Sequence, residues 1–302
     1  MRTISILLLQ FLFFSLSNAQ KIDSIRYANG YLFFHEYGRG EAIVLLTGGP
    51  GAGYQQLEDV ARTLGKSHRV ILLEQRGTGR SMPIPFDTST INLQTAHADL
   101  VRVLDHLKLS QAIFVGHSWG AMLAMSFATE HPSRVSSLVL IAPGPFKLDN
   151  DVFTIYTTNK EARFTPGERK MLDSALKRMQ SPNASKEDSS VYYKWELSPV
   201  IYDRNKIDSL VVVINKAGLN PKTGSFIFQS LGRQQFDLSK RLVGFTKPVH
   251  IITGAQDPMA FISYEVKILL PNSQLHWINK AGHFPMFEQP HQFYSILSNS
   301  LR

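Results

Sequence analysis

Short apolar runs alternate with amphipathic stretches along the chain from Ile25 onward. The runs are rich in Val, Ile, Leu and Phe and are bounded by Gly, Pro, Ser or Asn, which is the pattern of β-strands. The predicted strands are Tyr31–Tyr37, Ala42–Leu46, Arg69–Leu73, Ala112–Val115, Ser137–Ile141, Val249–Thr253 and Gln274–Ile278. Several of them are apolar without a break, as strands of a parallel sheet are when helices cover both of its faces.

Between two of these strands, apolar residues recur at the spacing of an amphipathic helix. They are Leu93, Ala96, Leu100, Val103, Leu104 and Leu107. Strands that alternate with helices in this way predict an α/β fold with an open, mostly parallel central sheet and helices on both faces. In such a fold, the functional residues lie at the carboxyl ends of the strands.

The alternation of strands and helices is interrupted between about residues 145 and 245. Thr165 to Glu168 form a capping box with proline at the first helical position, which predicts a helix that runs towards Gln180. A long helical insertion within an otherwise regular sheet is most simply a lid over the site. We therefore predict a core formed by residues 20–144 and 246–302, and a helical cap, or lid, formed by residues 145–245.

The N-terminal segment, residues 1–19, has the pattern of a secretory signal peptide. Arg2 provides a positive start, Ile4–Leu16 is almost wholly apolar, and the small residues Ser17 and Ala19 stand where a signal peptidase cleaves. The apolar run is too short for a typical membrane-spanning helix. We expect cleavage after Ala19 and an exported protein, periplasmic or secreted, with an uncleaved N-terminal anchor as the alternative.

Composition and charge exclude several classes of protein. Hydrophobic residues make up 43% and charged residues 19% of the 302 residues, which excludes a wholly disordered, collagen-like or coiled-coil chain. The formal net charge is +8, but the basic residues are spread along the chain, so we do not expect nucleic-acid binding. The chain has no cysteine, and this excludes disulfides, thiolate zinc sites and cysteine nucleophiles.

Three side chains with the chemistry of a catalytic triad follow three predicted strands. Ser118 is the centre of a G-x-S-x-G pattern, residues 116–120, in which a strained strand-to-helix turn presents the hydroxyl. His283 follows the last predicted strand, and Asp257 follows the strand before it. The order serine, aspartate, histidine is that of α/β-hydrolases. We predict Ser118 as the nucleophile, His283 as its base, and Asp257 as the carboxylate that orients the imidazole.

An oxyanion hole made of two backbone N–H groups should accompany this triad. One N–H group is that of Trp119, directly after the serine. The other lies in the glycine-rich loop after an early strand, where we favour Gly49 over Gly48. His117 directly precedes Ser118, and a side chain at this neighbouring position should face away from the serine, so we do not expect His117 to be the base.

The glycine-rich segments of the chain resemble the proline iminopeptidase branch of the α/β-hydrolases. The matching segments are Gly-Gly-Pro-Gly at 48–51, Glu-Gln-Arg-Gly-Thr-Gly-Arg-Ser at 74–81 and Gly-His-Ser-Trp-Gly at 116–120. The resemblance extends from Tyr31 to the C-terminus and is weaker in the lid. The chain departs from the family's usual pattern at Thr47, Glu74 and His117, where the family has histidine, aspartate and often a second glycine.

One lid segment also resembles this family. The sequence Tyr-Tyr-Lys-Trp-Glu at 192–196 is similar to the family's Trp-x-x-Trp-Glu segment. The resemblance implies that Glu196 binds the free α-amino group of the substrate. We expect Tyr192, Trp195 and Trp119 to surround the substrate's N-terminal residue. A carboxylate binds an ammonium through a charge-assisted hydrogen bond, but a lid glutamate can equally be a solvated helix residue.

The sequence therefore predicts a serine hydrolase that works through an acyl-enzyme intermediate. The resemblance implies a proline iminopeptidase-like aminopeptidase that releases an N-terminal residue. A carboxylesterase or lactonase is the alternative, because Thr47 and His117 weaken the peptidase pattern, and a non-catalytic ligand-binding homologue is a third interpretation. We expect a small-molecule or short-peptide substrate, no metal or organic cofactor, no nucleic-acid partner and no stable membrane insertion after signal cleavage.

Overall fold

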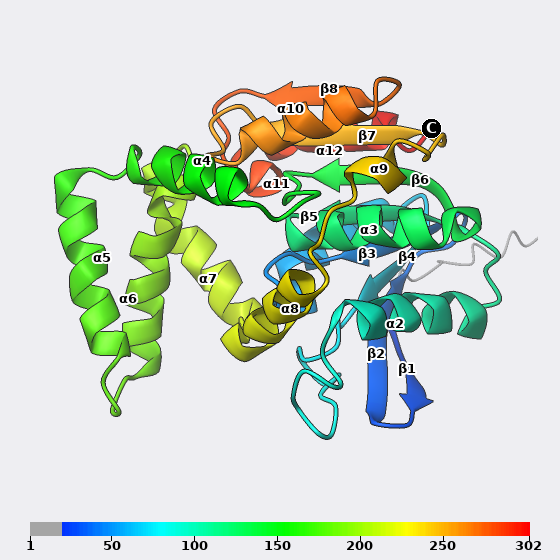
Figure 1. Cartoon of the computed structure of the whole chain (residues 1–302), viewed down its shortest axis with the longest axis horizontal. Coiled ribbons are helices and arrows are strands. Elements are labelled where there is room, and N and C mark those ends of the chain that lie inside the picture. The colour runs from blue at the N-terminus through cyan, green and yellow to red at the C-terminus, as the bar shows by residue number, and fades with distance from the viewer. Residues whose placement is uncertain (1–19) are drawn as a thin grey trace, which may run out of the picture.

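The computed structural model describes residues 20–302, so the predicted signal segment, residues 1–19, lies outside the described residues. Within the described part, eight strands form one sheet in the order β1-β2-β4-β3-β5-β6-β7-β8. β1 and β2 are antiparallel to their neighbours, and the other strands pair in parallel (Figure 1). The strands are β1 Lys21–Tyr27, β2 Gly30–Tyr37, β3 Ala42–Leu46, β4 Arg69–Leu73, β5 Ala112–His117, β6 Val135–Ile141, β7 Val249–Gly254 and β8 Gln274–Ile278.

The predicted strands are all present, and the sheet adds one strand that the apolar pattern did not predict. β3 and β5 at the centre are buried at every residue, as expected of parallel strands that are covered on both faces. β1 carries Lys21, Asp23 and Arg26 and has no buried residue. It pairs with β2 at the edge of the sheet, where charged side chains protect an exposed strand edge.

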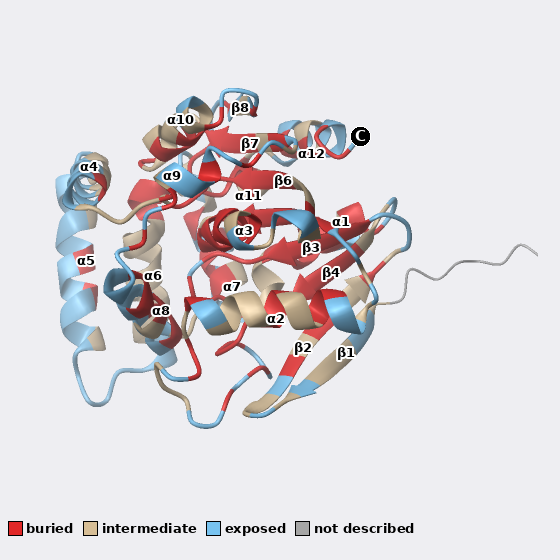
Figure 2. Cartoon of the chain, turned by 45° about the vertical axis from the view of Figure 1, so that its right-hand side comes forward, coloured by how far each residue is buried: buried red, intermediate tan, exposed pale blue. Residues whose placement is uncertain are grey.

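Helices cover both faces of the sheet, and the apolar residues beneath them form two cores. α2 (Leu93–His106), α3 (Trp119–Glu130) and α10 (Ala260–Leu269) contribute to the core on one face. α1 (Glu58–Leu64) and α12 (Pro290–Asn299) contribute to the core on the other face. Figure 2 shows that the central strands and α3 are buried, whereas the helices farthest from the sheet are largely exposed.

The chain between β6 and β7 is helical, in the region predicted as the lid. Its helices are α4 Asn150–Glu161, α5 Pro166–Met179, α6 Lys186–Leu197, α7 Ile207–Ala217, α8 Pro221–Arg233 and α9 Ser239–Leu242. The capping box predicted at Thr165 is confirmed, because the side chains of Thr165 and Glu168 each accept a hydrogen bond from the other residue's backbone N–H group. In Figure 1, α4 to α7 project beyond the sheet on the left. None of the described helices has both the length and the apolar character needed to cross a membrane.

Residues at the start of α8 form hydrogen bonds with two glycine-rich loops of the core. The Asn220 N–H donates to the Gly51 carbonyl over 2.9 Å. The carbonyl of Gly77 accepts from Asn220 Nδ2 at 3.0 Å and from Thr223 Oγ1 at 2.8 Å. Gly51 and Gly77 have φ values of +106° and +82°, and a Cβ on either would lie 2.4 Å from a lid oxygen. Glycine is therefore required at both contacts.

Candidate active site

The predicted nucleophile lies on a strained turn between a strand and a helix. β5 ends at His117 and α3 begins at Trp119, so Ser118 is the single residue between them. Its φ of 54° and ψ of −114° lie in a region that non-glycine residues avoid. A Cβ on Gly116 would lie 2.3 Å from the Gly120 carbonyl oxygen. The glycine therefore lets the helix approach the strand closely enough to form the turn.

The predicted acid and base meet at the carboxyl ends of the last two strands. His283 Nδ1 and Asp257 Oδ2 are 2.8 Å apart, and both side chains are buried. The Asp257 carboxylate also accepts the Met259 N–H at 2.9 Å, which fixes its orientation. Asp257 lies on the loop after β7 and His283 on the loop after β8. The structure thus brings together, from two different loops, the predicted base and its predicted carboxylate partner.

Ser118 and His283 line the same small cavity, whose volume is about 190 Å³. No hydrogen bond joins the Ser118 hydroxyl to the His283 imidazole within residues 20–302, and such bonds are often long before a substrate binds. The apolar residues of the wall come from the glycine-rich loop, from lid residues and from the residue after the histidine. They are Ala52, Leu197, Ile214, Ala217, Leu219 and Phe284.

The hydrogen bonds of the glycine-rich loop distinguish the two candidates for the oxyanion hole. The Gly48 N–H donates to the Gln56 side-chain oxygen at 2.6 Å and is therefore occupied. Gly49 lines the cavity, and neither its N–H nor that of Trp119 donates to another described residue. The N–H groups of Gly49 and Trp119 thus have no partner among the described residues, and this pair stays our prediction for an oxyanion hole.

The lid residues predicted around the substrate differ in position. Glu196 lines the cavity that contains Ser118. Tyr192 and Trp195 do not line it, and Tyr193 does. The face of α6 directed to the cavity carries Tyr193, Glu196 and Leu197, which are spaced three and four residues apart. The role of Tyr192 and Trp195 in binding substrate stays a prediction.

The carboxylate of Glu196 is already engaged by a cation of the protein. Lys160 Nζ, at the end of α4, donates to Glu196 Oε1. The side chains of Lys160 and Glu196 are 14% and 32% exposed, so the pair is partly shielded from water. The predicted anchor for a substrate ammonium is thus part of an internal ion pair.

Comparisons with known proteins decide the family. The model of the family described as alpha/beta hydrolase fold matches residues 41–290. This protein is an α/β hydrolase. The chain is 26% identical to a proline iminopeptidase of Heyndrickxia coagulans over 89% of its own length and 93% of that protein. It is 30% identical to a Bacillus subtilis protein described as a 2-succinyl-6-hydroxy-2,4-cyclohexadiene-1-carboxylate synthase, over 86% of this chain and 90% of that protein.

Solved structures agree with this fold. An alpha/beta fold family hydrolase from Bacillus anthracis superimposes with a TM-score of 0.72, at 18% identity, over 93% of this chain and 99% of that chain. The relatives carry the names of different reactions, so membership establishes a hydrolase of this fold and leaves its substrate class to the details of the site. Among the described residues, no group of three or more His, Asp or Glu could hold a metal ion.

A buried network that the sequence did not reveal connects the two segments of this hydrolase that carry the predicted oxyanion-hole residues. Gln75 Nε2 donates to both the carbonyl and the hydroxyl oxygen of Thr47, each at 2.9 Å. Gln75 Oε1 accepts the Trp119 indole N–H at 2.9 Å. Trp119 is 3% exposed and does not line the cavity of Ser118. Its indole binds Gln75 and supports the loop, and contact between this ring and a substrate stays a prediction.

Glu288 is a second residue whose role the sequence did not reveal. It binds both the loop that carries His283 and the lid. Its carboxylate accepts the Gly282 N–H at 2.6 Å, and its other oxygen accepts the N–H groups of Tyr202 and Asp203 at 2.7 and 3.0 Å. Burial raises the pKa of Glu288, and the three N–H groups oppose that shift. The His283 N–H itself donates to a lid carbonyl at 2.7 Å. The lid thus fixes the position of this histidine.

His117 lies beside the site rather than away from it, contrary to our expectation. Its ring lines the cavity of Ser118, and its centroid is 4.9 Å from that of His283. Its Nε2–H donates to the His283 carbonyl at 2.9 Å, and burial together with the neighbouring His283 lowers its pKa to about 3. His117 is therefore neutral and a weak base, so it supports the loop of His283 without taking its place.

The carboxylate of Glu74 organises the loop that follows β4. The proline iminopeptidase branch, which this chain resembles, usually has aspartate at this position. The Glu74 carboxylate accepts hydrogen bonds from the His35 imidazole at 2.7 Å and from the backbone and side chain of Arg80 at 2.7 and 2.6 Å. Burial alone would raise the pKa of Glu74, but these hydrogen bonds outweigh it and lower the pKa to about 2. Glu74 is thus a structural anion beneath the loop that contacts α8.

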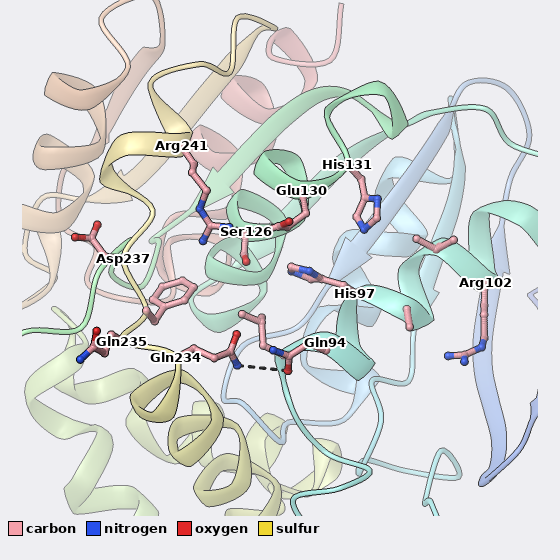
Figure 3. A pocket seen from close by; sticks show the side chains of 14 residues that line it. Gln94, His97, Arg102, Ser126, Glu130, His131, Gln234, Gln235, Asp237 and Arg241 are labelled. Carbon is pink, nitrogen blue, oxygen red and sulfur yellow. Dashed lines mark hydrogen bonds and ion pairs between the residues drawn. The ribbon is translucent and has the colours of Figure 1, made fainter.

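A larger cavity, of about 680 Å³, lies elsewhere in the hydrolase, between α2, α3 and the end of α8 (Figure 3). His97, Ser126, Glu130 and Arg241 line it, and the last two form an ion pair. Burial lowers the pKa of His97 to about 4, and no predicted site residue lines this cavity. We place the active site in the smaller cavity, because that one holds the strained serine and the histidine that binds a carboxylate.

Proposed function

We propose that this α/β hydrolase is a serine hydrolase that cleaves small acyl compounds with an uncharged, apolar acyl group through an acyl-enzyme intermediate. The observation that carries this proposal is that Ser118, on its strained turn, lines one cavity with His283, whose Nδ1 lies 2.8 Å from Asp257. A serine hydroxyl beside a histidine that is oriented by a carboxylate is the arrangement of an activated nucleophile.

The proposed reaction assigns one role to each group at the site. His283 takes the proton of the Ser118 hydroxyl as the oxygen attacks the substrate carbonyl, and Asp257 stabilises the imidazolium that forms. The N–H groups of Gly49 and Trp119 stabilise the negative oxygen of the tetrahedral intermediate. His283 then gives its proton to the leaving group. Water enters, loses a proton to His283, and releases the acid by the same steps in reverse.

The cavity supports a small apolar acyl group. Its volume of about 190 Å³ is below the range of typical pockets for drug-sized ligands. Half of the side chains in its wall are apolar, and the carboxylate of Glu196 is neutralised by Lys160. Transfer of an uncharged acyl group into such a site costs less desolvation free energy than transfer of an unpaired charge.

A second candidate, the aminopeptidase, is favoured by the position of Glu196 in the cavity wall and by the likeness to a proline iminopeptidase. In this reaction the same triad would cleave an amide, and Glu196 would release Lys160 to bind the substrate's α-ammonium. That exchange costs the free energy of the internal ion pair, so we place this candidate second.

Paired assays separate the two candidates. We expect the protein to hydrolyse 4-nitrophenyl butyrate with a higher kcat/KM than L-proline or L-alanine 4-nitroanilide, and Ser118→Ala to abolish both activities. A marked preference for the free-amine anilides would reverse the order of the candidates. Retention of ester hydrolysis by folded Ser118→Ala would overturn the serine mechanism itself.

A further inference from the structure

The wall of the catalytic cavity contains a single carboxylate, and a lysine of the protein binds it. Among the described residues that line the cavity, Glu196 is the only acidic one. Its partner, Lys160, lies 36 residues earlier in the chain, on α4 rather than α6. The ion pair therefore joins two lid helices and places an ammonium group on this carboxylate, although Lys160 itself does not line the cavity.

The charge of this pair determines which substrates the cavity favours. An unpaired carboxylate beside Ser118 would attract a substrate that carries an ammonium, through a charge-assisted hydrogen bond. With Lys160 in place, the carboxylate and the ammonium sum to zero charge. A cationic substrate must displace Lys160, whose side chain is only 14% exposed, and leave that charge without its partner in a partly desolvated position. The Coulomb attraction between the two charges is stronger in such a position than in free solution, because the effective dielectric constant is lower.

We propose that Lys160 is a specificity-determining residue: its ammonium binds Glu196, the carboxylate of a cation subsite in the cavity wall, and so selects uncharged acyl groups. The subsite would take the primary ammonium of an aminoacyl substrate when Lys160 is absent. This inference rests on the proposed serine hydrolase function and adds the element that sets its substrate class.

A neighbouring lysine provides a matched control. Lys194 lies on α6 and binds Asp208 at 2.6 Å, and neither residue lines the cavity. Lys194→Met therefore removes a lid ion pair and one positive charge, as Lys160→Met does, but leaves Glu196 paired. Methionine preserves the apolar stem of each lysine, so the packing of the stem is retained.

The experiment measures the ratio of kcat/KM on two esters that differ only by an ammonium, L-alanine benzyl ester and benzyl propionate. We expect Lys160→Met to raise this ratio roughly 10- to 100-fold, as the gain of one charge-assisted hydrogen bond implies. The double variant Lys160→Met, Glu196→Gln should lose that gain, because the subsite then lacks its anion. Lys194→Met should retain the wild-type ratio.

An unchanged ratio in folded, active Lys160→Met would overturn the inference, and so would a gain that persists in the double variant or appears equally in Lys194→Met. Lys160→Gln serves as a second variant if Lys160→Met does not fold. Failure of the proposed function is distinguishable, because wild type would then hydrolyse neither ester. The subsite can still be measured in that case by titration with L-alaninamide, which should bind Lys160→Met at least tenfold more tightly than wild type.

Discussion

Replacement of Gln75 by methionine should weaken both the fold and the oxyanion hole. Gln75 makes three buried hydrogen bonds of 2.9 Å, two to Thr47 and one from the Trp119 indole. Methionine is similar in size but cannot donate and is only a weak acceptor, so the oxygens of Thr47 lose their donor and the indole N–H loses its acceptor. Each lost bond costs about 1 kcal/mol, and a buried polar group left unsatisfied costs more, so we expect a loss of about 2–4 kcal/mol in the free energy of unfolding.

The same change should lower activity, because Gln75 joins the two segments that carry the proposed oxyanion N–H groups. Thr47 precedes the loop of Gly49, the first proposed donor, and the Trp119 backbone N–H is the second proposed donor. Removal of one such donor costs about 10²–10³ in kcat, and a displaced donor costs less. We therefore expect kcat to fall roughly 10- to 100-fold on 4-nitrophenyl butyrate, with a smaller change in KM.

Denaturant unfolding and steady-state kinetics test this prediction together. Gln94→Met is the control, because Gln94 is exposed on α2 and makes only a long side-chain contact, of 3.4 Å, with Gln234. A double-mutant cycle with Trp119→Phe should give a coupling free energy of about 1 kcal/mol. A loss of stability with wild-type kcat would show that the network only supports the fold, and no change in either quantity would refute the reasoning.

Three further predictions concern the triad, the buried anion and the N-terminus. His283→Ala should reduce kcat nearly as far as Ser118→Ala, and Asp257→Asn should be milder than either, whereas wild-type activity of Asp257→Asn would place the acid elsewhere. The fold lowers the pKa of Glu74 from 4.5 to about 2, so ionised Glu74 stabilises the fold above pH 4.5, and this stabilisation is lost as the pH falls from 4.5 to 2. Wild type should therefore lose about 2–3 kcal/mol more unfolding free energy between pH 5 and pH 2 than Glu74→Gln does. Equal losses in the two proteins would contradict this prediction. We propose cleavage after Ala19, which mass spectrometry of the exported protein checks, and an intact N-terminus would support the anchor instead.

The sequence predicted the parts of the site that local chain geometry determines. A glycine-flanked serine between a strand and a helix specifies its own turn, and Ser118 has the strained dihedral angles that such a turn requires. Asp257 and His283 each follow a strand, and parallel strands bring their carboxyl ends to one edge of the sheet. Their meeting at 2.8 Å therefore follows from chain order together with the predicted fold.

The features of the site that the sequence did not reveal depend on tertiary packing. A shift of one residue rotates a helix face by about 100°, so a motif match in the lid could not decide whether Tyr192 or Tyr193 faces the cavity. The role of Gln75 depends on two loops that meet only in the folded chain. The pairing of Glu196 with Lys160 crosses from one lid helix to another, and the sequence has no period or spacing that indicates it.

The most direct test of the central claim is to identify the residue that becomes acylated. The protein is mixed with 4-nitrophenyl butyrate, quenched in acid within the first turnover, digested and examined by tandem mass spectrometry. We expect a butyryl group on Ser118 in wild type, no such group in Ser118→Ala, and greater accumulation in a variant that deacylates slowly. A butyryl group on another residue, such as Ser126 in the larger cavity, or turnover by Ser118→Ala, would contradict the assignment of Ser118 as the nucleophile.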